Sequence, residues 1–76
     1  MEFERLAQIV AEVMNLNREE IRPESDLAED LGADSLDVYQ IIIDVEDELQ
    51  TEIPAEDAVN VRTVKDILNL ANKAQG

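Results

Sequence analysis

Apolar side chains recur at steps of three and four residues through most of this chain, and that spacing restricts it to α-helices. The first amphipathic stretch covers residues 2–14, with its apolar positions at Phe3, Leu6, Val10, Val13 and Met14. The same spacing predicts a second helix from Ser35 to about Gln50 and a last helix that opens at Thr63. No stretch alternates apolar and polar residues for long enough to form a strand.

Residue types at the helix ends support this division. Asp34 or Ser35 can cap the second helix, and Asp37 favours its first turn electrostatically. Pro54 suits the first turn of a short third segment. Residues 63–66 resemble a capping box, with Asp in the usual Glu position, at the start of the last helix. We therefore predict an all-α fold with three main helices and one short third helix.

A long connection, residues 15–32, separates the first helix from the second. Asn15 marks the end of the first helix, and Pro23 disfavours helix at the residue before it. Spaced apolar residues predict that the connection is packed on the core: Leu16, Ile21, Leu27 and Leu31. The length of 76 residues allows one core, so residues 1–76 are expected to form a single domain.

Acidic residues dominate the charge and concentrate in the middle of the chain. The chain has six Lys and Arg and nineteen Asp and Glu, which gives a formal net charge of −13. Between Pro23 and Val61 there are thirteen of the nineteen carboxylates and no Lys or Arg. Such a surface repels nucleic acid and anionic lipid, and it attracts basic protein surfaces. No apolar stretch approaches the ~20 residues of a membrane span, so we expect a cytoplasmic protein. We also expect it to be a monomer.

The chain lacks the residues on which most enzymes depend. It has no Cys and no His, which excludes thiol nucleophiles, thiolate metal sites and imidazole bases. Carboxylates alone offer no nucleophile paired with a base, so an enzyme is not expected. A calcium loop counted from Asp26 would place Leu31 where an EF-hand needs Gly, so no metal site is predicted, although diffuse binding of divalent cations stays open.

The second helix carries two apolar lines. One line is the predicted core face, formed by Val38, Ile41, Ile42, Val45 and Leu49. The other line consists of Leu36, Tyr39 and Ile43. Either the third or fourth helix covers this second line, or it is exposed for a transient partner. The polar residues around it favour exposure, because apolar contacts rimmed with charge are typical of such sites: Asp37, Gln40, Asp44, Glu46 and Asp47.

The run Glu-Asp-Leu-Gly-Ala-Asp-Ser-Leu-Asp, residues 29–37, resembles the signature of the acyl carrier protein family of fatty acid synthesis. Residues 45–49, 51–54 and 63–64 also look like this family. In the family, the Ser of Asp-Ser-Leu receives 4′-phosphopantetheine from coenzyme A, and acyl groups are then carried on this arm as thioesters. The resemblance implies a four-helix bundle with a short third helix, no enzymatic activity, and attachment of the arm to Ser35.

The position of Ser35 supports attachment independently. It follows a loop containing Gly32, which a modifying enzyme can reach, and a phosphodiester there would meet free N–H groups at a helix start. The alternative is that Ser35 only caps the helix. The resemblance assigns Asp34 and Asp37 to recognition by a basic phosphopantetheinyl transferase.

The resemblance also implies positions that meet the partner enzymes of fatty acid synthesis: Leu36, Tyr39, Gln40, Ile43, Glu46 and Asp47. Gln40 replaces a Glu of many members, and Tyr39 replaces a smaller aliphatic residue. The family shelters its acyl chain between the second and third helices, which implies a lining of Ile41, Ile42, Val45, Ile53, Ala58 and Val61.

Other readings remain within and outside the family. The chain could be a specialised carrier for polyketide synthesis or for D-alanine, although Ala33-Asp34 fits the fatty-acid type better. It could also be an acidic adaptor whose Ser35 is never modified. The intact mass of the expressed protein distinguishes a carrier from such an adaptor.

Overall fold

The structure, a computed structural model, describes residues 1–75. Its elements are α1 (Phe3–Met14), the 3₁₀ helix η1 (Arg18–Glu20), α2 (Ser35–Leu49), α3 (Ala55–Ala58) and α4 (Val64–Gln75). Within the described part of the chain there is no strand, and only an isolated bridge pairs Asp26 with Thr63. The predicted all-α fold with a short third helix is confirmed.

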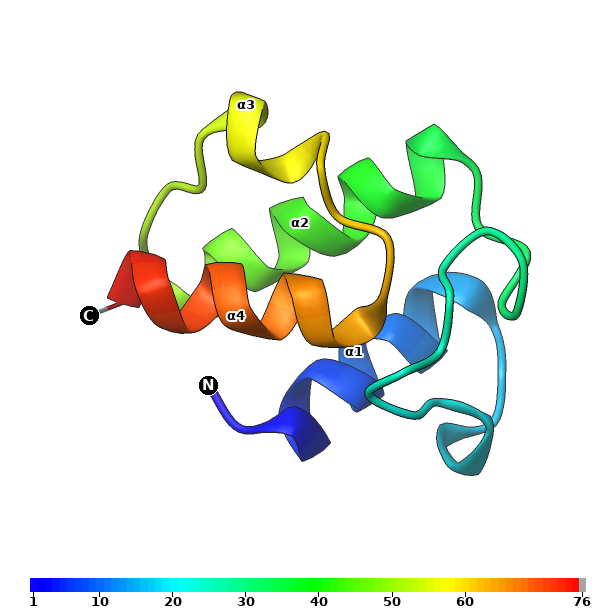
Figure 1. The fold of residues 1–76 in the computed structure, drawn as a ribbon. Coiled ribbons are helices and arrows are strands. Elements are labelled where there is room, and N and C mark those ends of the chain that lie inside the picture. Colours follow the sequence, from blue (N-terminus) through cyan, green and yellow to red (C-terminus); the bar gives the residue numbers. More distant parts are fainter. Residues whose placement is uncertain (76) are drawn as a thin grey trace.

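Helices α1, α2 and α4 pack around one core, into which each projects its predicted apolar face. In Figure 1, α1 lies at the bottom and α3 at the top, with α2 and α4 between them. The largest fully buried side chains come from these three helices and from the connection after α1: Leu6, Val10, Ile21, Ile41, Val45, Val64 and Ile67. Burial of such aliphatic side chains is the main stabilising contribution in a chain of this size.

The connection between α1 and α2 is packed on the core, as its spaced apolar residues predicted. Ile21, Leu27 and Leu31 are buried, and Leu16 is partly buried against the same cluster. The 3₁₀ turn η1 was not predicted, because three residues are too short to show an apolar period. The Glu20 carboxylate accepts a hydrogen bond from the N–H of Asn17 at 2.8 Å, which closes this turn.

Backbone hydrogen bonds join this connection to the start of α4. The N–H of Leu27 donates to the carbonyl of Arg62 at 2.9 Å, and the N–H of Val64 donates to the carbonyl of Ser25 at 3.1 Å. The side chain of Arg62 also pairs with Asp26 at 3.2 Å. The segment that leads to α2 is therefore fixed to the segment that follows α3.

Capping boxes define the starts of α2 and α4. Asp34 caps α2: its carboxylate accepts from the N–H of Asp37 at 2.9 Å, and the Asp37 carboxylate accepts from the N–H of Asp34 at 3.1 Å. At α4, Thr63 and Asp66 exchange the equivalent bonds at 3.0 and 3.2 Å. Of the two candidates for the cap of α2, Asp34 takes the role, and Ser35 becomes the first helical residue.

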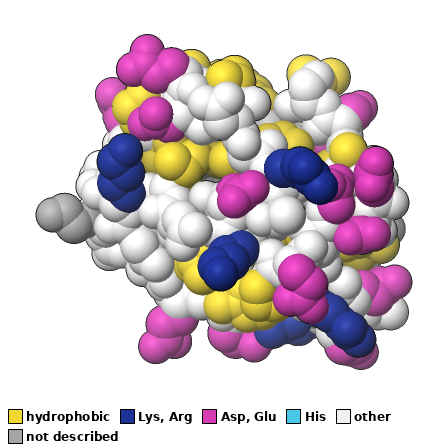
Figure 2. Space-filling view, viewed as in Figure 1, with side chains coloured by type: hydrophobic (Ala, Val, Ile, Leu, Met, Phe, Trp, Pro, Cys, Tyr) yellow, Lys and Arg dark blue, Asp and Glu magenta, His cyan; other side chains and the backbone are white. Residues whose placement is uncertain are grey.

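Helix α3 is a single turn and buries none of its residues fully. Pro54, predicted in the first turn, instead occupies the N-cap position, one residue before the helix. Its φ of −57° still suits a chain entering a helix, because proline fixes this angle close to the helical value. Seen from the same side as the ribbon, apolar side chains are exposed toward the α3 end, while basic side chains are scattered over the α4 face (Figure 2).

Candidate functional site

Ser35 is the exposed first residue of α2. Because Asp34 performs the capping, the Ser35 hydroxyl makes no hydrogen bond to any residue in the range 1–75. The chain reaches this point through Gly32, whose φ of +73° lies in the left-handed region that glycine favours. The N–H of Ala33 then donates to the carbonyl of Leu27 at 2.8 Å. The hydroxyl is thus held on a fixed backbone and is open to solvent.

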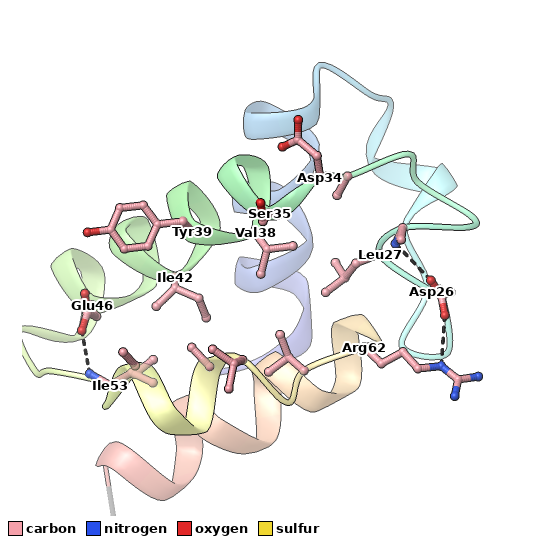
Figure 3. Close-up of a pocket in the computed structure, with 16 residues that line it drawn as sticks. Asp26, Leu27, Asp34, Ser35, Val38, Tyr39, Ile42, Glu46, Ile53 and Arg62 are labelled. Atoms are coloured by element: carbon pink, nitrogen blue, oxygen red, sulfur yellow. Dashed lines mark hydrogen bonds and ion pairs between the residues drawn. The ribbon is translucent and has the colours of Figure 1, made fainter.

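A cavity of about 670 Å³ lies between α2 and α3, and Ser35 stands on its rim (Figure 3). Its wall is mainly aliphatic, built from α2, from the connection before it, and from the segment around α3: Leu27, Ala33, Val38, Ile42, Ile53, Ala58, Val59 and Val61. Charged groups also border it, namely Asp26, Asp34, Glu46 and Arg62. The cavity can therefore shield an apolar chain from water beside Ser35.

Four of the six residues predicted to line an acyl-chain pocket border this cavity. Ile42, Ile53, Ala58 and Val61 line the cavity, as the family resemblance implied. Ile41 and Val45 do not: both are fully buried in the core, one helical turn apart on the face of α2 that is turned away from the cavity.

Several lining residues were missed by sequence reasoning. Val38 lies four residues before Ile42, so helical spacing alone could have identified it. Leu27 and Ala33 come from the connection, and no local pattern indicates that this segment turns back to the cavity.

The second apolar line of α2 is exposed. Leu36 is 75% exposed, Tyr39 64% and Ile43 37%, so the alternative in which α3 or α4 covers them is wrong. Val59, just after α3, is also exposed, at 79%, and lines the same cavity as Tyr39. Tyr39 of α2 and Val59 after α3 are thus exposed apolar side chains on opposite sides of the cavity.

The polar residues around this line differ in how firmly they are held. Gln40 donates from its amide nitrogen to the Asp44 carboxylate at 2.9 Å. The Glu46 carboxylate accepts from the N–H of Ile53 at 2.6 Å, which ties α2 to the segment before α3. Asp47 is exposed, and its carboxylate has no hydrogen-bond partner within residues 1–75. Asp34 and Asp37 of the capping box, like Gln40, Glu46 and Asp47, belong to the same part of the chain as the exposed line of Leu36, Tyr39 and Ile43.

Hydrogen bonds lower the pKa of two carboxylates, Asp26 and Asp66. The backbone N–H of Glu29 lowers the pKa of Asp26, and the guanidinium of Arg62 lowers it further. The backbone N–H of Thr63 and then that of Arg62 lower the pKa of Asp66. Both carboxylates therefore favour the charged form that accepts these bonds.

Comparison with known proteins agrees with this arrangement. The sequence model of a family described as a phosphopantetheine attachment site matches residues 4–71. Acyl carrier proteins from three strains of Clostridium perfringens type A are each 46% identical over 66 residues, which is 87% of this chain and 87% of theirs. The solved structure of a protein assigned as an acyl carrier protein from Mycobacterium tuberculosis matches with a TM-score of 0.87 and 31% identity, covering 93% of this chain and 95% of that one.

The fold and the site thus define a phosphopantetheine-bearing carrier domain. The chain belongs to the acyl carrier protein family: it carries acyl groups on a covalently attached phosphopantetheine and is not an enzyme. This confirms the family, the fold and the cofactor expected from the signature. No helix among residues 1–75 is long and apolar enough to cross a membrane.

The surroundings of Ser35 fit a phosphodiester-linked arm. The N–H groups of Ser35 and Leu36 make no hydrogen bond within residues 1–75, so they are available to phosphate oxygens at the positive end of α2. The adjoining aliphatic cavity can receive the acyl end of the arm. When bound, the group supplies the thiol that forms the thioester. The chain itself contains no cysteine.

Proposed function

We propose that this chain carries intermediates of fatty acid biosynthesis as thioesters on a 4′-phosphopantetheine arm attached to the oxygen of Ser35. The observation that carries the proposal is the exposed, unbonded hydroxyl of Ser35 on the rim of a 670 Å³ aliphatic cavity. An aliphatic wall gains free energy by enclosing a hydrocarbon chain and gains little from a small polar group. This favours a fatty acyl cargo over D-alanine.

The partners are a phosphopantetheinyl transferase and the enzymes of fatty acid synthesis, which would approach with basic surfaces. We assign this contact to the eight residues expected from the sequence: Asp34, Leu36, Asp37, Tyr39, Gln40, Ile43, Glu46 and Asp47. Support comes from the exposure of the apolar members and from the carboxylates around them. Residues 1–76 would act as one carrier domain, monomeric and cytoplasmic. Association with a basic enzyme is accelerated by this charge complementarity.

Attachment at Ser35 can be tested by mass. Incubation with coenzyme A, Mg²⁺ and a broadly active phosphopantetheinyl transferase should add one arm to the parent chain and none to Ser35→Ala. The chain has only one other serine, Ser25, which is 7% exposed and accepts a hydrogen bond from the N–H of Arg22. Ser25→Ala is therefore the matched control and should still gain one arm. An unchanged parent mass, or an arm that persists in Ser35→Ala, contradicts the proposal.

A further inference from the structure

The large apolar side chains that are exposed fall into two groups, according to whether they border the cavity. Among residues 1–75, the exposed side chains of this kind are Leu36, Tyr39, Ile43 and Val59. Tyr39 and Val59 line the cavity between α2 and α3, whereas Leu36 and Ile43 lie outside it. Contact with a partner on the outer face of α2 accounts for Leu36 and Ile43. The place of Tyr39 and Val59 at the cavity requires a second explanation.

Tyr39 lies on the path from Ser35 into the cavity. It is four residues after Ser35 and three before Ile42, and all three border the cavity. Residues three and four apart are neighbours on the surface of a helix, so these three form a continuous line along α2. In Figure 3, Tyr39 lies on α2 between Ser35 and Glu46, and Ile42 projects toward the segment around α3. A chain that leaves the Ser35 oxygen toward Ile42 therefore passes the Tyr39 ring.

The charged groups at the border of the cavity already have partners within the domain. The Asp34 carboxylate caps α2, and Asp26 pairs with Arg62 at 3.2 Å. The Glu46 carboxylate accepts from the N–H of Ile53 at 2.6 Å. A hydrocarbon chain needs no hydrogen-bond partner, and it gains free energy by covering exposed apolar surface. The occupant that best fits the space between Tyr39 and Val59 is therefore the acyl chain itself.

We propose that Tyr39 and Val59 retain the acyl cargo: the Tyr39 ring and the Val59 methyl groups pack on the attached chain from opposite sides of the cavity. This inference rests on the proposed carrier function. It gives Tyr39 a role toward the cargo in addition to its contact with partners, and it gives Val59 its first role. It also selects among cargoes, because an acyl chain of several carbons reaches both side chains and an acetyl group does not.

Retention is measured as the stabilisation that the chain confers on the folded domain. A broadly active phosphopantetheinyl transferase with octanoyl- or acetyl-coenzyme A loads Ser35 with either group, and intact mass verifies complete loading. Urea denaturation then gives the ratio of the two unfolding equilibrium constants, because a group that contacts only the folded state stabilises it. Tyr39→Ala should bring this ratio about fivefold closer to one, since the apolar contact of the ring is lost.

Three variants complete this experiment. Leu36→Ala removes an exposed apolar side chain of α2 that lies outside the cavity, so the ratio should stay within about twofold of the parent value. Tyr39→Phe keeps the ring and should match the parent. Val59→Ala removes two methyl groups and should bring the ratio about threefold closer to one. Equal ratios in Tyr39→Ala and Leu36→Ala would overturn the proposal.

The emission of Tyr39 gives a second measurement. The chain has one tyrosine and no tryptophan, so its fluorescence reports this side chain directly. Acrylamide should quench the purified octanoyl-loaded carrier less than the acetyl-loaded carrier, because the longer chain covers the ring. Equal quenching would contradict the proposal.

Two further outcomes separate this proposal from the proposed function. If Tyr39→Ala weakens binding of the transferase but leaves the octanoyl-to-acetyl ratio unchanged, the ring serves partners alone and the retention proposal is wrong. Absence of any mass gain in the parent chain overturns the carrier function, and retention with it.

Discussion

Three consecutive isoleucines of α2 occupy three different environments, which makes them an internal test of how this helix is oriented. Ile41 is fully buried in the core, Ile42 is 4% exposed and lines the cavity, and Ile43 is 37% exposed on the outer face. Replacement by Ala removes the same three carbon atoms at each position. Differences in stability among the three variants therefore report the surroundings alone.

The expected losses follow from those surroundings. Removing three buried carbons forfeits about 2.4 kcal/mol of transfer free energy, and the void left in a packed core adds to it. We expect about 3–4 kcal/mol for Ile41→Ala. Ile42→Ala should cost about 2–3 kcal/mol, because its outer side already faces the cavity and fewer contacts are lost. Ile43→Ala should cost under about 1 kcal/mol, since the better helix propensity of Ala offsets part of the loss.

Urea denaturation followed by circular dichroism at the helix band measures these differences. A domain of 76 residues has a stability of roughly 4–11 kcal/mol at typical values per residue, so Ile41→Ala should move the midpoint sharply. The slope with urea should stay constant in all three variants. Equal losses for Ile41→Ala and Ile43→Ala would refute the assignment of the two faces.

Three further predictions concern charge. Asp37→Lys or Glu46→Lys should slow association with a basic partner enzyme severalfold in stopped-flow measurements, more at low salt than at high salt; unchanged rates would exclude α2 as the docking face. Moderate salt or millimolar Mg²⁺ should raise the melting temperature by screening the −13 charge, and a flat series would mean that repulsion is negligible. The pKa of Asp66 is lowered by folding, so its contribution is present above about pH 4 and lost as the pH falls further. The melting-temperature gap between the parent and Asp66→Ala should accordingly narrow from pH 7 to pH 2.5, and a constant gap would contradict this.

The parts of the fold that could be predicted from sequence are those encoded by nearby residues. The start of α2 follows from Asp34 and Asp37, three positions apart, and the start of α4 follows from Thr63 and Asp66 in the same way. The exposed line on α2 could also be predicted from sequence, because a helix in a small bundle buries only one apolar face.

The parts that could not be predicted depend on contacts between distant segments. The pairing of Leu27 with Arg62 joins residues 35 positions apart, and nothing in either segment indicates it. The same contact brings the connection to the cavity, which explains why Leu27 and Ala33 were missed as lining residues. Ile41 and Ile42 are adjacent in sequence, and only the packing of α1 and α4 against α2 decides which of them meets the cavity.

The capping of α2 by Asp34 leaves the Ser35 oxygen free to change its substituent. Since the Ser35 oxygen takes no part in holding the helix start, the backbone needs no rearrangement when that oxygen gains or loses a substituent. The proposed attachment of an arm at Ser35, and its removal, can then repeat on one folded chain. This is possible because Asp34, and not Ser35, caps α2.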